Sequence, residues 1–497
     1  MSGDHADAVE FTNRLKNFLA SPPPGNFLEF ERNWWTGTEV AAAGRQIDLL
    51  LRQAGVPDDA AIGVLVRNRV GHAAALLGLV GSNRSVVSLS TLLSDGMIAD
   101  DIRQLRLGAI VAEEQDWTDA LRETLRDGRV GISFPTAGVT PSLVPGSDLR
   151  LAEPATTDRQ YVAVLTSGTT GAPKRIELHA GALARGREIV TGIYPGMAGH
   201  QVEIQIHHFS SIGGILQLLC YGADRFPFCL LEKFEVEEWV AAIDRHQAKV
   251  ISAGAPMIRS LLAADLPPGS LTSAEVLHGG GGAIEPEVLE ECERRFNVQV
   301  CWAFGATEFA GTLASWTRDL KTEFGNSKRG SCGRVLPDCE VRITDRDTGD
   351  LLPAGEEGRL EALIPVMSSE WIRTNDLARL DEDGFLYVLG RMDGAINRGG
   401  FKVLPNAVAS ALRRHPAVVD AVVFALPDQR LGEVPVAAVE AKPGSSVTGE
   451  ELRTFCRQHM AVTSVPAEIR VYERLPRQTL KVDMPRLRED WVKNDAG

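Results

Sequence analysis

Strand-like and helix-like segments alternate along most of this chain, and this alternation limits the possible folds more than any other feature. A helix-periodic stretch at 38–56, with Thr38 as the expected N-cap, leads into an apolar run at 60–66. A second helical stretch at 71–83 precedes strand-like runs at 84–89 and 107–114. Because helices that alternate with strands act as crossovers, the sequence predicts an α/β fold with parallel-rich sheets and packed helices.

The same rhythm continues beyond residue 200. Helical patterns at 236–248 and 286–296 alternate with strand-like runs at 249–255 and 298–305. A chain of 497 residues is also too long for one small core. We therefore expect a large N-terminal domain over residues 1–391.

Beyond residue 391, short helices and strands follow one another at closer intervals. This pattern predicts a small C-terminal α+β domain over residues 392–497, a common domain size. The joint between the two parts, "GRMDGAINRGGFK" at 390–402, contains glycines that suit a hinge.

Charge and composition exclude several classes of protein. The formal net charge is -14 and no Lys/Arg-rich run is present, so nucleic acid is a poor candidate partner. The N-terminus lacks the pattern of a signal peptide, and no apolar stretch approaches the roughly 18 residues of a membrane span. We expect a soluble cytoplasmic protein without a membrane span.

The cysteines and histidines give little sign of a metal centre. The seven cysteines are odd in number and contain no C-x-x-C pair, which favours buried reduced thiols over a disulfide framework or a zinc site. The pair His207-His208 has no Cys or carboxylate neighbour at ligand spacing.

The stretch "YVAVLTSGTTGAPKR" at 161–175 runs from a strand into a loop rich in hydrogen-bond donors. A Walker loop is excluded because Lys174 follows Pro173 and precedes Arg175. A dinucleotide fingerprint is excluded at "GGGGAIEP", because Ile284 stands where the last glycine belongs. Glycine backbone N–H groups, threonine hydroxyls and a lysine still suit an anion cradle, although such a loop alone is more often a solvated turn.

Four further motifs follow this loop in order: "FGATE" at 304–308, "RTNDLARL" at 373–380, "GRMDGAINRGGFKV" at 390–403 and "LPRQTLK" at 475–481. Together with "LTSGTTGAPK" they resemble the core motifs of the adenylate-forming superfamily of acyl- and aryl-CoA synthetases, adenylation domains and luciferase. The resemblance spans about residues 40 to 490. It implies an ATP-dependent, AMP-forming ligase. A carboxylate attacks the α-phosphate of MgATP, and coenzyme A then takes the acyl group from the adenylate.

The resemblance also assigns roles to residues of the large domain. Thr307 would contact the α-phosphate, Glu308 would bind Mg²⁺, and Asp376 and Arg391 would hold the ribose. The adenine would lie against Phe304, Gly305 and the glycines Gly280, Gly281 and Gly282. The β- and γ-phosphates would be held by Thr166, Ser167, Gly168, Thr169, Thr170, Gly171 and Lys174.

In the small domain, Lys481 corresponds to the lysine that reaches the substrate carboxylate and the ATP bridging oxygen. Asp393 corresponds to the hinge about which the small domain turns between the half-reactions. Gly399, Gly400 and Lys402 would lie on the face that meets the active site during thiolation.

The acyl pocket of the family corresponds here to "HHFSSIGGILQLL" at 207–219 and its neighbours. Small residues there predict a roomy pocket, and no Asp stands where an α-ammonium group would be held. A hydrophobic carboxylic acid without an amino group is the expected substrate. The implied lining residues are Phe209, Ser210, Gly213, Gly279 and Ala306.

The sequence departs from the family pattern at four places, and the two departures in the small domain bear on the second half-reaction. Asn375 replaces a glycine, and some twenty residues are absent between Gly358 and Arg373. In the small domain, 407–409 read Ala-Val-Ala in place of Glu-Ile-Glu, and Leu480 precedes the lysine. The alternatives kept are an adenylating enzyme that loads a carrier protein or stops at the acyl-adenylate, and an inactive binding protein on the same fold. A homodimer is left open.

Overall fold

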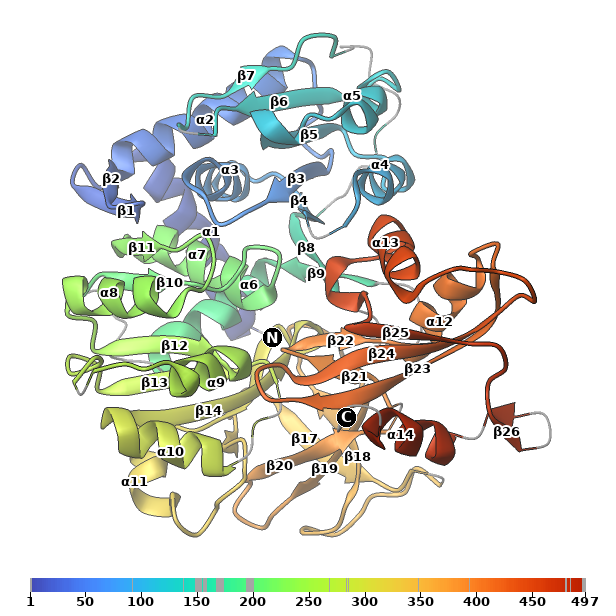
Figure 1. Cartoon of the computed structure of the whole chain (residues 1–497). Helices are drawn as coiled ribbons and strands as arrows, with labels where there is room; N and C mark the ends of the chain where they lie inside the picture. Colours follow the sequence, from blue (N-terminus) through green and yellow to red (C-terminus); the bar gives the residue numbers. More distant parts are fainter. Residues whose placement is uncertain are drawn as a thin grey trace.

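The computed structural model describes residues 2–91, 93–136, 138–147, 154, 159–166, 174–193, 201–267, 269–282, 284, 286–346, 348–392, 394–478, 481–482 and 484–493. Figure 1 shows the N-terminal elements at one end of the molecule and the middle of the chain below them, with the C-terminal elements along one side. Mixed sheets and helices in a large N-terminal part and a separate C-terminal part confirm the predicted fold class.

The first large sheet has the order β7-β6-β5-β3-β4-β8-β9. Its inner strands are parallel, while β7 and β9 are antiparallel edge strands. The strands are β3 (Ile62–Val66), β4 (Val86–Ser90), β5 (Ala109–Glu113), β6 (Val130–Phe134), β7 (Ser142–Leu143), β8 (Tyr161–Thr166) and β9 (Lys174–His179). The predicted crossovers at 71–83 and its neighbours are therefore confirmed.

Two further sheets complete the parallel-rich part. In the order β10-β11-β1-β2, the strands are β1 (Asn26–Phe30), β2 (Asn33–Thr36), β10 (Glu203–Gln205) and β11 (Phe228–Leu230). In the order β12-β13-β14-β15-β16, they are β12 (Val250–Gly254), β13 (Val276–Gly280), β14 (Gln299–Ala306), β15 (Gly311–Ser315) and β16 (Arg334–Val335).

In the chain, an antiparallel sheet follows these layers and precedes the small domain, and the sequence did not predict it. Its order is β17-β18-β19-β20, with β17 (Glu340–Thr344), β18 (Gly358–Leu363), β19 (Ile372–Leu380) and β20 (Leu386–Arg391). Antiparallel neighbours need only a short connection, so this stretch carries no helix-periodic signal.

The small domain has a sheet of order β22-β21-β24-β23, with β25 added beside β24. These strands are β21 (Ile396–Arg398), β22 (Phe401–Val403), β23 (Val418–Asp428), β24 (Gly432–Ala441) and β25 (Glu468–Tyr472). A separate hairpin follows, formed by β26 (Arg477–Gln478) and β27 (Lys481–Val482).

The helices cover these sheets, and none of those described is long and apolar enough to cross a membrane. They are α1 (Ser2–Ala20), α2 (Gly37–Gln53), α3 (Val70–Gly81), α4 (Asp95–Gln104), α5 (Asp119–Leu125), α6 (Ala180–Glu188), α7 (Ile212–Asp224), α8 (Val236–His246), α9 (Ala255–Ala263), α10 (Pro286–Phe296), α11 (Arg318–Phe324), α12 (Pro405–Arg413), α13 (Gly449–His459) and α14 (Met484–Lys493).

Helix α3 is buried over its whole length and crosses α2 at two glycines. A Cβ on Gly78 would lie 2.3 Å from the Cα of Gly44, closer than any side chain allows. The two backbones therefore touch at this point, which lets the apolar α3 sit in the core between the sheet and α2.

Helix α2 begins earlier than predicted, because Thr36 and not Thr38 is its N-cap. The N–H of Glu39 donates to Thr36 Oγ1 at 3.2 Å, and the N–H of Thr36 donates to Glu39 Oε2 at 2.7 Å. This reciprocal pair is a capping box, which satisfies two N–H groups that the helix leaves unpaired.

We expect Thr36→Ala to lower the free energy of unfolding by about 1 kcal/mol, because it removes the acceptor for the Glu39 N–H. Urea unfolding followed by circular dichroism measures this change. Thr38→Ala is the matched control, since Thr38 is exposed in the first turn of the same helix. Equal losses in the two variants would show that the capping box does not stabilise α2.

Candidate active site

The carboxyl ends of β12, β13 and β14 form one edge of a parallel sheet. Their register pairs Gly254 with Gly280 and Gly279 with Trp302, so the segments that follow leave from the same side. In open α/β sheets ligands bind at this edge. The segments found there include Gly281 and Gly282 after β13, and Ala306 at the end of β14.

A short 3₁₀ turn, Thr307–Phe309, continues directly from β14. It places Thr307 and Glu308 at the edge, both partly exposed. Within the described ranges, the Glu308 carboxylate has no hydrogen-bond or ion-pair partner, so its oxygens are available to a cation. The ring of Phe304 lies 6.2 Å from that of Phe309, while Gly305 pairs with Thr312 of β15.

Asp376 is held on β19 by the two residues that precede it. Its N–H donates to Thr374 Oγ1 at 2.9 Å, and its residue is only 6% exposed. Asn375, which departs from the family pattern, accepts a hydrogen bond from Arg359 at 3.3 Å through its side chain. Arg391 pairs with Asp376 across β19 and β20, so the structure places both expected ribose residues side by side in the sheet.

The tip of the β21–β22 hairpin of the small domain sits on the edge formed by β12 and β13. A Cβ on Gly400 would lie 2.6 Å from the Gly281 carbonyl oxygen, and one on Gly399 would lie 3.1 Å from Pro256 Cγ. Both glycines have positive φ, at 88° and 59°. At Gly400 a side chain is therefore excluded both by space and by backbone conformation, whereas at Gly399 the backbone conformation is the stronger restriction.

The hairpin that carries Lys481 lies elsewhere. Strand β27 pairs with β26, and Figure 1 shows β26 at the outer side of the small domain, away from β13 and β14. The structure thus brings Gly399 and Gly400 to the edge, with Lys402 following in β22, and does not bring Lys481 there.

Strands β8 and β9 form the hairpin beneath the Gly/Thr loop. Thr166 pairs with Lys174, and Thr166 Oγ1 donates to the Lys174 carbonyl at 3.2 Å. Thr166 and Lys174 are therefore held together, and Lys174 is exposed. The expected phosphate-binding residues between them (Ser167, Gly168, Thr169, Thr170 and Gly171) and the expected hinge Asp393 lie outside the described residues.

The segment His207–Ser210 is fixed by Asn68, a residue that sequence reasoning missed. Asn68 Nδ2 donates to the His207 carbonyl at 3.2 Å, and the N–H of Phe209 donates to Asn68 Oδ1 at 3.0 Å. The Phe209 side chain is fully buried in the core. His208 Nδ1 accepts from the Ser210 N–H at 3.1 Å.

Two of the glycines near this segment serve packing. A Cβ on Gly279 would lie 2.2 Å from the Trp302 ring, so this indole fills the space that the sequence analysis expected to be open. A Cβ on Gly214 would lie 2.1 Å from the His208 carbonyl oxygen. Gly213 differs, since the first atom that its Cβ would meet is His207 Cγ, at 4.0 Å.

The wall formed by His207 and His208 is uncharged at neutral pH. Burial lowers the pKa of the His207 imidazole to about 4, and burial together with nearby Arg67 lowers the pKa of His208 to about 4. The arginines next to the segment are paired, Arg67 with Asp116, and Arg69 with Glu113 at 3.2 Å and Glu232 at 2.8 Å. Neither of these two arginines is therefore an unpaired cation.

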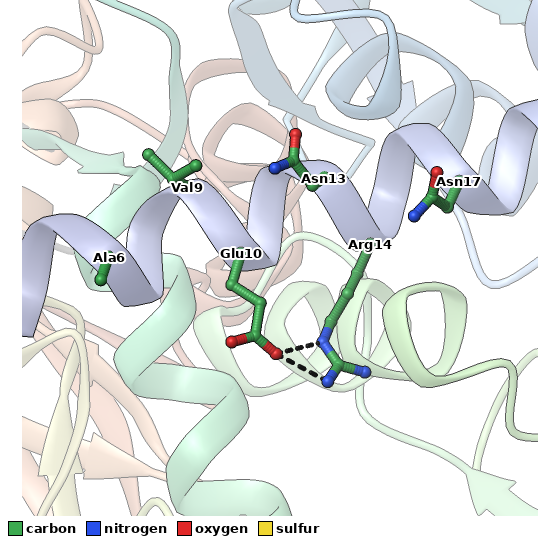
Figure 2. Close-up of a pocket in the computed structure, with 6 residues that line it drawn as sticks. All are labelled: Ala6, Val9, Glu10, Asn13, Arg14 and Asn17. Atoms are coloured by element: carbon green, nitrogen blue, oxygen red, sulfur yellow. Dashed lines mark hydrogen bonds and ion pairs between the residues drawn. The ribbon is translucent and has the colours of Figure 1, made fainter.

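A surface hollow on α1 is unrelated to this edge. Figure 2 shows that it is lined by side chains of this one helix, with the Glu10–Arg14 ion pair at 2.7 Å beside it. Residues of a single helix cannot enclose a ligand, so this hollow carries no site.

Two family models match the chain. One, described as AMP-binding enzyme, covers residues 16–364, and the other, described as AMP-binding enzyme C-terminal domain, covers residues 407–480.

Among relatives, a 2-succinylbenzoate–CoA ligase of Bacillus velezensis is 33% identical over 340 residues, 65% of this chain and 67% of the relative. One from Geobacillus kaustophilus is 29% identical over 448 residues, 86% of this chain and 87% of the relative. A long-chain-fatty-acid–CoA ligase of Bacillus subtilis is 29% identical over 67% of this chain and 62% of its own length.

Solved structures share the fold over nearly the whole chain. The o-succinylbenzoate CoA synthetase of Bacillus subtilis with a product analogue gives a TM-score of 0.78 at 24% identity, covering 96% of this chain and 98% of the other. An amide bond synthetase of Marinactinospora thermotolerans gives 0.81 at 24% identity, covering 96% and 99%.

We expect the His207 and His208 rings to stay neutral until the pH falls to about 4, because burial penalises the imidazolium. The unfolded chain takes up these protons near pH 6.5. The contribution of the two neutral rings to stability is therefore complete above pH 6.5 and is lost as the pH falls toward 4. An NMR titration of the folded protein, with the denatured protein as control, measures this difference. A titration midpoint near pH 6.5 for both rings in the folded protein would contradict the claim that His207 and His208 are neutral at lower pH.

Proposed function

Because the chain belongs to the AMP-binding enzyme family, and so to the adenylate-forming superfamily, we propose that it is an AMP-forming acid–thiol ligase. It activates a hydrophobic carboxylic acid with MgATP to an acyl-adenylate and pyrophosphate. It then transfers the acyl group to coenzyme A. The large domain, 1–391, binds ATP and the acid, and the small domain, 392–497, turns about Asp393.

The observation that most directly supports the proposal is the close contact between the Gly400 backbone and the carbonyl of Gly281. In this contact Gly399 and Gly400, which we propose as part of the thiolation face, lie next to Pro256 and Gly281 at the edge formed by β12 and β13. A thiol that enters beside Gly399 and Gly400 would reach an adenylate held at that edge. An enzyme that only adenylated its substrate would have no need of this arrangement.

Each expected ATP contact has a physical role. Lys174 and the loop after Thr166 neutralise the β- and γ-phosphates, and Thr307 donates to the α-phosphate. Glu308 fits a magnesium ion, since its unpaired carboxylate supplies an oxygen ligand, and the bound ion would neutralise phosphate charge. Asp376 is held by the Thr374–Asn375 turn and accepts from the ribose hydroxyls, beside Arg391.

The uncharged wall supports a substrate with an apolar body and a single carboxylate. His207 and His208 are neutral, and Gly213 leaves space beside the His207 ring. Trp302 reduces the space near Gly279, which favours a flat aromatic acid over a bulky polycyclic one. Among the relatives, the long-chain-fatty-acid–CoA ligase is named for an apolar monocarboxylic acid, whereas the 2-succinylbenzoate–CoA ligases are named for an aryl acid with a second carboxylate.

The alternative acceptor is a carrier protein, or a partner that takes the acyl group from the adenylate. The substitutions at 407–409 prompted this alternative, but Val408 and Ala409 are buried in the core of the small domain. At these two positions the departure changes internal packing. Coenzyme A therefore remains the proposed acceptor.

A panel of carboxylic acids tests the proposed function. We expect aromatic and medium-chain monocarboxylic acids to drive ATP–pyrophosphate exchange, and AMP and thioester to form together once coenzyme A is added. α-Amino acids and dicarboxylic acids should be poor substrates. The described arginines next to His207 and His208 are already paired, and we know of no unpaired charged side chain there to bind the second ionised group of such a substrate. AMP release without thioester would favour the alternative acceptor, and no exchange with any acid would favour an inactive protein.

Two substitutions should separate the half-reactions. Lys481→Ala should slow pyrophosphate exchange by roughly two to three powers of ten, as for the loss of one preorganised electrostatic group. Gly400→Ala should leave exchange near its original rate and slow thioester formation, because a methyl group cannot fit against the Gly281 carbonyl.

Gly444→Ala is the matched control for Gly400→Ala. Gly444 has a φ of 79°, close to that of Gly400, but its Cβ would meet no atom within 4 Å. Gly444→Ala introduces the same backbone strain without the steric contact, so it should leave the rates of both half-reactions unchanged. Equal slowing of thioester formation in the two glycine variants would contradict the claim that the contact between Gly400 and the Gly281 carbonyl is needed for this step.

A further inference from the structure

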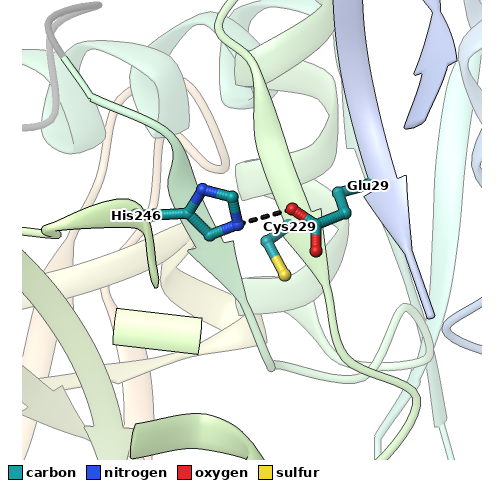
Figure 3. Close-up of side chains that lie close together, drawn as sticks. All are labelled: Glu29, Cys229 and His246. Atoms are coloured by element: carbon teal, nitrogen blue, oxygen red, sulfur yellow. Dashed lines mark ion pairs between the residues drawn. The ribbon is translucent and has the colours of Figure 1, made fainter. Parts of the chain in front are cut away.

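Three side chains that could bind a metal ion meet far from the candidate active-site residues in sequence. They are Glu29 on β1, Cys229 on β11 and His246 at the end of α8, and Figure 3 shows them facing one another. One ligand atom from each lies within 4.8 Å of the other two. The spacing of 200 and 17 residues explains why no sequence pattern revealed the cluster.

The fold brings them together in three ways. Strands β1 and β11 are parallel neighbours, and their register places Glu29 directly beside Cys229. Helix α8 ends at His246, because Gln247 adopts a left-handed conformation as the C-cap. The edge of the His246 ring contacts Trp34, with ring centroids 5.9 Å apart, which fixes the imidazole over the strands.

The cluster is buried and its polar atoms point inward. Glu29 and Cys229 are each 2% exposed, and the side chain of His246 is 9% exposed. Arg245 holds one Glu29 oxygen, Oε1, at 2.7 Å. The other oxygen, Oε2, faces His246 Nε2 at 2.5 Å, and neither atom has a further hydrogen-bond partner among the described residues.

We propose that Glu29, Cys229 and His246 form a binding site for a zinc-like divalent cation. A thiolate, an imidazole nitrogen and a carboxylate oxygen are the ligands that Zn²⁺ takes, at about 2.0 to 2.3 Å. In such a site the ligand atoms are about 3.3 to 3.7 Å apart. Since Nε2 and Oε2 lie closer than that, the ion would enter as the imidazole and carboxylate part by about 1 Å, through small side-chain rotations.

The types of ligand atom in the cluster, and the charges beside them, determine which kind of metal ion it would bind. Burial raises the pKa of the Cys229 thiol to about 12, so the empty cluster holds a neutral thiol. A bound zinc ion displaces that proton, and the guanidinium of Arg245 stays on Glu29 Oε1 and keeps the carboxylate oriented. Magnesium and calcium prefer oxygen ligands alone, so this site is separate from magnesium bound with ATP.

Hydrogen bonds also connect the neighbourhood of this cluster to the segment His207–Ser210. Leu231 directly follows strand β11, and its carbonyl accepts a hydrogen bond from Asn68 Nδ2 at 3.2 Å. Asn68 Oδ1 in turn accepts a hydrogen bond from the N–H of Phe209. An ion bound by Glu29, Cys229 and His246 would hold β1, β11 and α8 together and so would stabilise these hydrogen bonds. It would stabilise the fold and take no part in the chemistry.

Zinc titration of the full chain tests the site. The reduced protein, freed of metal by a chelator, competes for Zn²⁺ with a chromophoric chelator, and we expect one tightly bound ion per chain. Cys229→Ser and His246→Gln should each weaken binding by about 100-fold. Cys292→Ser is the matched control, because Cys292 is another buried cysteine outside the cluster and should bind zinc as the original protein does.

A second readout does not depend on how the variants fold. Co²⁺ added to the original protein should produce the absorption band of a thiolate-bound ion, and Zn²⁺ should raise its melting temperature. Absence of that band, or zinc binding that Cys229→Ser leaves unchanged while Cys292→Ser weakens it, overturns the proposal. Neither outcome bears on the adenylating activity.

Discussion

The backbone contact between Gly400 and the Gly281 carbonyl links the two parts of the molecule. It has no room for a side chain on Gly400, and both Gly399 and Gly400 use backbone conformations that other residues adopt only with strain. Around it the parallel strands β12, β13 and β14 supply the edge, and the antiparallel β19 and β20 supply Asp376 and Arg391. The proposed chemistry depends on whether the small domain can make and release this contact.

The Gly400 contact is not alone at this interface, since Ser94 Oγ also donates to the Gln458 carbonyl at 3.1 Å. A contact between glycine backbones buries little apolar surface, so leaving it costs little free energy. The Lys481 hairpin lies on the outer side of the small domain while the glycine tip is seated. A rotation that brought Lys481 to the edge would have to lift Gly400 from Gly281. The two predicted roles of the small domain therefore exclude each other in time.

Local patterns predicted much of the fold, because periodicity reports which face of an element is buried. The helix α3 and the strand β12 lie where the sequence indicated. The antiparallel sheet of β17 to β20 was missed, since short connections leave no helical signal between its strands. The cap of α2 was misplaced by two residues because Thr36 and Thr38 are equally good candidates in sequence, and only the position of Glu39 distinguishes them.

The candidate site was predicted by its motifs, whereas the contacts that shape it were not. Asn68, Trp302 and the Glu29–Cys229–His246 cluster depend on residues far apart in the chain, so no local pattern marks them. A crystal structure with a hydrolysis-resistant acyl-adenylate tests the central claim most directly. We expect its adenine against Gly280–Gly282, its ribose hydroxyls on Asp376 and its acyl group beside His207 and Gly213. An analogue bound away from the β13–β14 edge would contradict the account.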